Sequence, residues 1–477
     1  MDVALLQVTD PGWVVPVWRH PVRWGRLVTS RAGQVCEAIG FPRVVATPQR
    51  RESHHAKGEI NPGSLVKAGL YAMEVHNPPA GSGPAESWWA GMSGAAVLCQ
   101  GLLLGVVTQD TDGFNSRRLV AVPITTVITD PGFAALVSRH CGRVPVVEPV
   151  ELVGLAEPVV VADSPAGLLR AEVALTPFRD RPEFDELQRW CEGLEWSSIR
   201  LVVGPGGQGK TRLARQLTAH LAGRGWAALM LAERAGVEHV AVLAQVRVPT
   251  LVVVDYAEGR ADQFEAVLNA LGQAEAKVRL LLLARAAGAW RSERVDPSPL
   301  LEPLADDRIV VELGPLEPTA SGREQAWSQA LTALATGLNE LDGAHDQQQG
   351  VDWAGVAGQL PIPVLDGPGH RTILAVQMDA LAHLLQAGDP ISGTDGRAER
   401  VLMAHESRYW TRVANRFGVM VSPATRECLV AIATLWGATD AAQAHQLLSA
   451  VLPGTGAEAL TTIAEWLAAL YHDGQRY

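Results

Sequence analysis

One stretch of sequence limits the fold of this chain more than any other. It runs Gly204-Pro205-Gly206-Gly207-Gln208-Gly209-Lys210-Thr211 and fits the pattern G-x-x-x-x-G-K-[ST]. The apolar run 199–203 precedes it, and leucines at helical spacing follow it, as a strand, a turn and a helix require. Glycines in such a turn let backbone N–H groups surround phosphate oxygens at the positive end of a helix. The stretch therefore predicts a phosphate-binding loop built on Gly204, Gly206, Gly207 and Gly209.

Two side chains of this loop and one later acid are expected to complete a nucleotide site. Lys210 would contact the β- and γ-phosphates, and the hydroxyl of Thr211 would bind Mg²⁺. Asp255 ends the apolar run 251–254, and a carboxylate there could reach the same ion. We therefore expect ATP or ADP, together with Mg²⁺, at Lys210, Thr211 and Asp255.

Two further residues are candidates for hydrolysis. Glu258 follows Asp255 by three residues and could orient the attacking water. Because Tyr256, not an acid, stands directly beside Asp255, we expect slow turnover. Arg285 ends the apolar run 280–284, where a cation could contact the γ-phosphate. The simpler interpretations, an aspartate that caps the next helix and a solvated arginine at a strand end, stay open.

Size and charge narrow the remaining possibilities. The 477 residues suggest about three domains. With 51 acidic and 40 basic residues the net charge is −11, and no basic run could cover a nucleic-acid duplex. Five scattered cysteines, none in C-x-x-C spacing, suit a reducing cytoplasm. No basic leader and no long apolar stretch is present, so we expect a cytoplasmic protein with neither membrane nor nucleic acid as a partner.

Residues 1–143 have the pattern of a β domain. Short apolar runs alternate with Gly, Pro, Asn and Asp, and no long helical pattern is present. Within this domain, Gly91-Met92-Ser93-Gly94 precedes the β-like run 95–99. Such a turn can hold a serine nucleophile, with the N–H groups of Ser93 and Gly91 turned toward an oxyanion. A plain tight turn is the alternative interpretation.

This part of the chain resembles the trypsin-like (chymotrypsin-fold) serine proteases. Ser93-Gly94 and the run 104–107 are similar to the nucleophile strand and its successor, and residues 2–8 to the segment around the catalytic aspartate. The resemblance implies an antiparallel β-barrel with Ser93 as nucleophile and Asp2 as the aspartate. Met92 and Ala95 depart from the family's Gly-Asp-Ser-Gly-Gly, and no histidine precedes Asp2. We therefore expect an N-terminally incomplete domain that lacks the family's general base.

The rest of the chain predicts a linker, an α/β core and helices. A linker rich in Val, Pro and Glu is expected over 144–176. Over 177–318 we expect a parallel sheet whose ligand lies at the carboxyl ends of the strands. The expected strands are 199–203, 227–231, 251–254, 278–284 and 309–313, and the expected helices are 178–195, 237–244 and 263–272. Later helical patterns cover 321–341, 372–386, 397–417, 425–436, 441–451 and 458–471.

The order of motifs from about residue 165 to 477 resembles the STAND class of signal-transduction ATPases, which is related to NB-ARC and AAA-type modules. The resemblance rests on the P-loop, on 255–258 and 283–285, and on weaker motifs at 313–316, 377–381 and 405–410. It implies a helical lid domain over 319–420 and a winged-helix-like module over 421–477, truncated at its end. It also implies an N-terminal effector and self-association in the ATP state.

Three functions remain open from the sequence. The first is a switch in signalling or defence, in which ATP favours an open, self-associating form and slow hydrolysis resets it. Its output would be the N-terminal domain, acting on an unknown protein partner or substrate. The second is an active serine endopeptidase regulated by an appended ATPase. The third is a scaffold with a degenerate nucleotide site, against which the intact Lys210, Thr211 and Asp255 argue.

Overall fold

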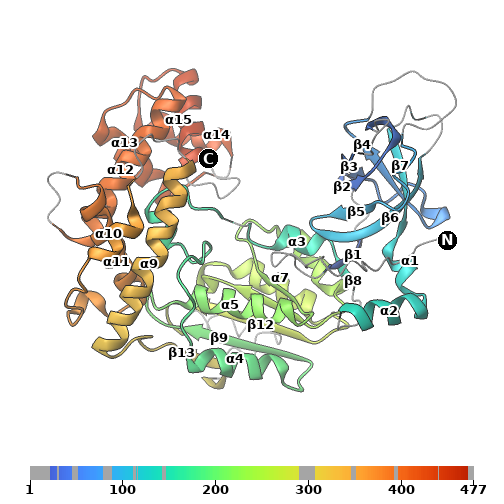
Figure 1. Ribbon diagram of the computed structural model, residues 1–477, viewed down its shortest axis with the longest axis horizontal. Coiled ribbons are helices and arrows are strands. Elements are labelled where there is room, and N and C mark those ends of the chain that lie inside the picture. The colour runs from blue at the N-terminus through green and yellow to red at the C-terminus, as the bar shows by residue number, and fades with distance from the viewer. Residues whose placement is uncertain are drawn as a thin grey trace.

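The fold is known from a computed structural model, which describes residues 22–28, 32–45, 52–78, 89–110, 114, 117–141, 147–158, 160–288, 307–344, 351–391, 396–438 and 440–470. A β domain, an α/β domain and a helical region follow one another along the chain. The α/β domain lies between the other two (Figure 1). This order of a β-barrel, a parallel α/β domain and a helical C-terminal region confirms the coarse architecture expected from the sequence.

The N-terminal domain is an antiparallel barrel. Its strands are β2 (Gln34–Gly40), β3 (His54–Ile60), β4 (Tyr71–Val75), β5 (Ala96–Cys99), β6 (Leu102–Asp110) and β7 (Arg118–Pro123). They pair in the order β2-β3-β4-β7-β6-β5, and β5 also pairs with β2, which closes the barrel. Alternate residues of each strand point inward. Small side chains such as Ala38 and Ala56, both fully buried, leave room for Met73 and Leu104 in the barrel core.

Additional elements flank the barrel. β1 (Trp24–Arg26) and β8 (Val147–Pro149) pair in parallel and extend the sheet from β6. Two helices follow β7, α1 (Ile124–Ile128) and α2 (Pro131–Cys141). The expectation of no long helix in this domain was wrong for α2. Its signal is weak because it buries Val137, with Phe133 partly buried, against Trp24 and offers no longer apolar stripe.

The α/β domain is built on a parallel sheet. Its strands are β9 (Ser197–Val203), β10 (Ala227–Met230), β11 (Thr250–Val254), β12 (Val278–Ala284) and β13 (Val310–Glu312). They lie in the order β10-β11-β12-β9-β13, so β12 is inserted between β9 and β11. Every residue of β11 and β12 is buried, because helices cover both faces of the sheet. The five strands confirm the apolar runs read from the sequence.

Helices form a layer on each face of this sheet. One face carries α4 (Pro182–Glu192) and α5 (Lys210–Gly223), and the other carries α3 (Glu151–Leu155), α6 (Val237–Val240) and α7 (Ala261–Leu271). The expected helix 178–195 is shorter than predicted, since Pro182 begins it and Gly193 leaves the helical conformation at φ −50°, ψ 159°. Leu194, which lies within the predicted range but after the end of α4, is therefore fully exposed.

The helical region has two cores. The first lies between α9 (Ala320–Ala344), α10 (Trp353–Gln359), α11 (Ile373–Gly388) and the start of α12 (Ala398–Phe417). The second lies between the end of α12 and the helices α13 (Pro423–Leu435), α14 (Ala441–Val451) and α15 (Ala457–Leu470). Thr372, Ser422 and Asp440 accept N–H groups in the first turns of α11, α13 and α14, which fixes where those helices begin. Within 421–438 and 440–470 the structure assigns these three helices and no strand.

The predicted linker 144–176 is described over 147–158 and 160–176, and its described residues pack into both neighbouring cores. Leu152 and Leu155 of α3 are buried beside α7, and Leu168 is buried in the core of α9. Between them, Ala156 forms an antiparallel bridge to Leu231, at the edge of the parallel sheet. These contacts hold the segment in place beside the P-loop region. Separately, among the residues described, no helix is both long and apolar enough to cross a bilayer.

Candidate nucleotide-binding site

The loop 204–209 connects β9 to α5 at the carboxyl edge of the parallel sheet. Gly207 and Gly209 have φ values of 77° and 86°, which glycine adopts at little cost. A Cβ on Gly207 would lie 3.1 Å from both the Cβ of Leu374 and the Oγ1 of Thr372. The Leu374 N–H also donates to the carbonyl of Gly207, at 3.2 Å. The beginning of α11 therefore sits directly on the loop, and only a glycine fits there.

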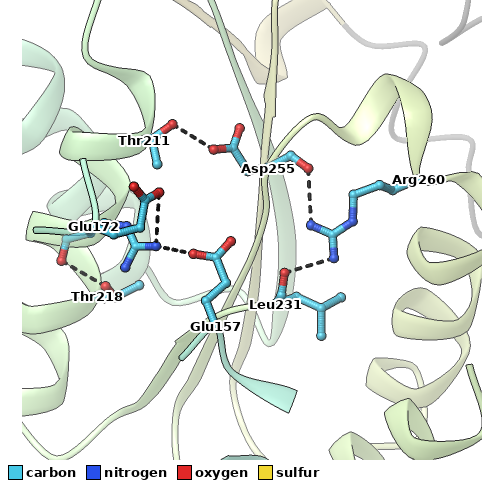
Figure 2. A network of polar contacts seen from close by, with 8 residues as sticks. Glu157, Glu172, Thr211, Thr218, Leu231, Asp255 and Arg260 are labelled. Atoms are coloured by element: carbon cyan, nitrogen blue, oxygen red, sulfur yellow. Dashed lines mark hydrogen bonds and ion pairs between the residues drawn. The ribbon is translucent and has the colours of Figure 1, made fainter. Parts of the chain in front are cut away.

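Thr211 and Asp255 meet at the end of this loop. The hydroxyl of Thr211 donates to Oδ2 of Asp255 at 2.7 Å (Figure 2), and the N–H of Tyr256 donates to Oδ1 at 2.9 Å. Asp255 is only 8% exposed, and this burial raises the pKa of its carboxyl against the opposing effects of Thr211, Tyr256 and Lys210. A hydroxyl and a carboxylate held side by side are hard oxygen ligands, so this pair fits Mg²⁺.

Lys210 lies against the inner side of the loop. Its ammonium donates to the carbonyls of Gly204, at 2.6 Å, and Pro205, at 3.1 Å. Partial burial lowers the pKa of the ammonium, and the carboxylates of Asp255 and Glu258 oppose this shift. A cation held at the turn by two neutral carbonyls keeps its full charge for an anion in the cavity.

Arg285 and Glu258 lie together beside the loop. Because β12 is inserted next to β9, Arg285 at the end of β12 lies close to the P-loop. Its backbone N–H donates to Oε1 of Glu258 at 3.3 Å, and Oε2 of Glu258 is buried with no hydrogen bond to any described residue. The guanidinium of Arg285 is exposed to the cavity, and within the described part of the chain no carboxylate pairs with it. The structure thus brings together Asp255 and the four residues predicted to act with it, which are Lys210, Thr211, Glu258 and Arg285.

All these side chains except Glu258 line one cavity of about 260 Å³. Its polar lining includes Gly206, Gly207, Gly209, Lys210, Thr211, Asp255 and Arg285. Its apolar lining includes Leu168, Leu169, Leu175, Phe178, Leu316, Ile373 and Leu374. A cavity that joins a phosphate-binding turn to an apolar chamber suits a nucleotide, whose base is flat and apolar on its faces.

Arg181 holds the loop in place, and sequence reasoning missed it. The side chain is 7% exposed and donates to the carbonyls of Gln208, at 3.0 Å, and Gly314, at 3.3 Å. It also pairs with Glu183 at 3.0 Å. Its partners are 27 and 133 residues away in the chain, so no local pattern could reveal them.

Further polar contacts lie next to Thr211 and Asp255 (Figure 2). Arg215, one turn after Thr211 on α5, pairs with Glu157 and Glu172 from the segment 147–176. Burial raises the pKa of the Glu157 carboxyl, and the charge of Arg215 opposes this shift. On the other side of Asp255, Arg260 donates to the carbonyls of Asp255, at 3.2 Å, and Leu231, at 2.8 Å. These contacts hold the carboxyl ends of β10 and β11 in place.

The protease-like residues are only partly described. Asp2 lies outside the described residues. Ser93 is exposed before β5, between Gly91 and Gly94, whose φ values are 100° and 90°. The histidines in the described part of the barrel contact other residues. His54 packs against Trp89 with ring centres 5.6 Å apart, His55 pairs with Glu37, and His76 with Glu59.

Comparison with known proteins links part of this geometry to a family. The family model described as "Novel STAND NTPase 5" matches residues 182–297, which include the P-loop, Asp255, Glu258 and Arg285. No curated protein matches the chain.

Three solved structures illustrate the distant likenesses. A point mutant of RuvB from Thermotoga maritima is 13% identical with a TM-score of 0.28, over 62% of this chain and 90% of that one. The replication initiator DnaA bound to AMPPCP and single-stranded DNA is 14% identical with a TM-score of 0.28, over 53% and 75%. A mutant of human heparin binding protein (CAP37) is 14% identical with a TM-score of 0.19, over 26% and 56%. Residues 182–297, which carry the P-loop and the residues around Asp255, are therefore similar to a family of STAND NTPases.

Proposed function

We propose that the protein is an ATP-binding, slowly hydrolysing switch of the STAND type. The observation that carries this proposal is the convergence of Lys210, Thr211 and Asp255 on one cavity that the helical region helps to enclose. In this proposal the protein is cytoplasmic, residues 421–477 form a winged-helix-like module, and the β-barrel is a trypsin-like output domain that contacts an unknown protein.

The side chains divide the work of binding and hydrolysis. Lys210 and Arg285 would neutralise the phosphates, and Thr211 with Asp255 would hold Mg²⁺, which supplies further neutralisation of phosphate charge when bound. In hydrolysis the water oxygen forms a bond to the γ-phosphorus. The bond from that phosphorus to the β–γ bridging oxygen breaks, and its electron pair stays on ADP. The water proton passes to Oε2 of Glu258, which is buried beside Arg285 and has no other hydrogen-bond partner among the described residues.

The switch follows from contacts that the two nucleotides would make differently. Ile373, Leu374 and Gln377 of α11 line the cavity together with the loop, and Leu374 is bonded to Gly207. A ligand can shift the position of the helical region only by the difference in its contacts with the two arrangements. The terminal phosphate is that difference between ATP and ADP. We infer that ATP favours an open, self-associating form and ADP a closed one.

A second candidate is an active serine endopeptidase regulated by the NTPase domain. The observation in its favour is the position of Ser93, exposed at the end of a closed barrel between two left-handed glycines. A fluorophosphonate probe separates the two candidates. Rapid labelling of Ser93, lost in Ser93→Ala, would support the peptidase. No labelling is expected if the barrel acts without peptide cleavage.

The nucleotide carried by freshly purified protein tests the main proposal. We expect wild-type protein to carry ADP or ATP, and Lys210→Ala to carry none. Lys277→Ala is the matched control, because Lys277 is in the same domain but donates to the carbonyl of Gly193. It should keep the nucleotide. A wild-type protein that neither retains nor binds ATP or ADP in the presence of Mg²⁺ would disprove the switch.

A further inference from the structure

Tyr256 is strained at the centre of the candidate site. It adopts φ 51°, ψ 44°, the left-handed region. This conformation costs a bulky residue about 1 kcal/mol or more, whereas glycine adopts it freely. The backbone turn has a clear reason, since it aims the Tyr256 N–H at Oδ1 of Asp255. A glycine would make the same bond, so the tyrosine side chain needs a reason of its own.

Packing does not provide that reason. The side chain is 60% exposed, so burial offsets little of the backbone strain. Tyr256 lines the cavity together with Lys210, Thr211 and Arg285. The charged groups that face its phenol are Asp255, Arg285, Glu172 and Glu258, and burial beside Asp255 raises the pKa of the phenol. The ring therefore stands among the groups that would surround a terminal phosphate.

Glu258 does not line the cavity, so a water in the cavity would have to pass the residues that do, Tyr256 among them, to reach it. Glu258 lies two residues beyond Tyr256, in the short helical turn Ala257–Gly259. Its Oε2 has no hydrogen bond within the described residues, and its Oε1 is held by the N–H of Arg285. Tyr256 stands in the sequence between Asp255 and this acid, and it lines the same cavity as Asp255.

We propose that Tyr256 is a positioning residue whose ring covers the terminal-phosphate end of the cavity and restricts the approach of water to Glu258. This inference rests on the proposed function. It assigns the slow turnover to a side chain, and it leaves the bonds made and broken in hydrolysis unchanged. It explains why a strained tyrosine stands where glycine would be relaxed.

Two variants separate the ring from the hydroxyl. Tyr256→Gly removes the ring and relieves the backbone, and Tyr256→Phe keeps the ring. We expect Tyr256→Gly to raise kcat for ATP hydrolysis about tenfold, with the Kd for ADP changed by less than about twofold. The purified variant should also carry more ADP relative to ATP than wild type does. Tyr256→Phe should keep both the rate and the nucleotide ratio of wild type.

Gln100→Gly is the matched control for relief of strain. Gln100 also has φ 51°, but it lies in the β5–β6 turn of the barrel. It should leave hydrolysis unchanged. An unchanged or lower kcat in Tyr256→Gly, at normal ADP affinity, would overturn the inference, as would a Tyr256→Phe variant as fast as Tyr256→Gly. In either case nucleotide binding by wild type would keep the proposed function intact. A wild type that binds no nucleotide would remove both.

Discussion

The hydroxyl of Thr211 donates a 2.7 Å hydrogen bond to Oδ2 of Asp255, across 44 residues of chain (Figure 2). The bond joins the first turn of α5, which follows β9, to the end of β11. These two strands are not neighbours in the sheet, because β12 lies between them. The bond therefore holds the Thr211 hydroxyl and the Asp255 carboxylate close enough for both to bind one metal ion. It also gives Oδ2 of a buried carboxylate a donor of its own, beside the Tyr256 N–H that donates to Oδ1, and a buried oxygen without a donor would be costly.

Asp255→Asn should stabilise the nucleotide-free protein at neutral pH. Burial raises the folded pKa of Asp255, so its ionisation opposes folding. The stability that the protonated carboxyl contributes is present below about pH 4, its unfolded value, and is lost as pH rises through the raised folded value. Chemical unfolding at several pH values should show Asp255→Asn gaining on wild type across that window. Mg²⁺ and ATP should stabilise wild type only. A stability difference that does not change with pH would contradict this assignment.

Gly207→Ala should destabilise the protein, and Gly206→Ala should not. Residue 207 has a positive φ of 77°, which disfavours any side chain, and a Cβ there would meet Leu374 and Thr372 at 3.1 Å. A Cβ at residue 206 would meet no atom within 4 Å. We expect Gly207→Ala to lose about 1–3 kcal/mol, from strain and from displacement of α11. Urea unfolding without nucleotide measures the difference, and equal losses in the two variants would contradict the contact between α11 and the loop.

Arg181→Met should weaken both folding and nucleotide binding. Its loss leaves the carbonyls of Gln208 and Gly314 without their donor, which costs about 1–3 kcal/mol. The loop would also lose the guanidinium that donates to its Gln208 carbonyl. Arg189→Met is the control, because Arg189 is exposed on α4, the helix that Arg181 directly precedes. Thermal unfolding and ADP titration of both variants test this, and a normal ADP affinity in Arg181→Met would show that the loop holds its shape alone.

Cys428 should react with an alkylating reagent long before three other cysteines. Cys428 is exposed, and Cys36, Cys99 and Cys191 are buried. Burial raises the pKa of these thiols to about 12, about 11 and about 12. Thiolate is the reactive form, so at about pH 8 fewer than about one in a thousand of the buried thiols can react. Peptide mapping after brief labelling of native protein gives the order, and fast labelling of Cys36 would mean that the barrel opens.

Local sequence was sufficient wherever one segment holds its own signal. Leu213, Leu217 and Leu221 recur at helical spacing, and all three are buried on α5. The continuous apolar run before Asp255 predicted a strand covered on both faces, and β11 is buried throughout. Short or weakly patterned elements were missed. α10 contains two glycines in seven residues, and α2 buries a narrow apolar face.

The sequence by itself determined the phosphate-binding loop, the acid at the end of β11 and the alternation of strands and helices, because each depends on residues a few positions apart. Only the tertiary structure decided that β12 brings Arg285 beside the loop, that Arg181 supports the loop, and that residues 168–176 line the cavity. These relationships depend on which strands become neighbours and which distant surfaces pack together. Their energies come from contacts between distant segments, and no local pattern of residues records them.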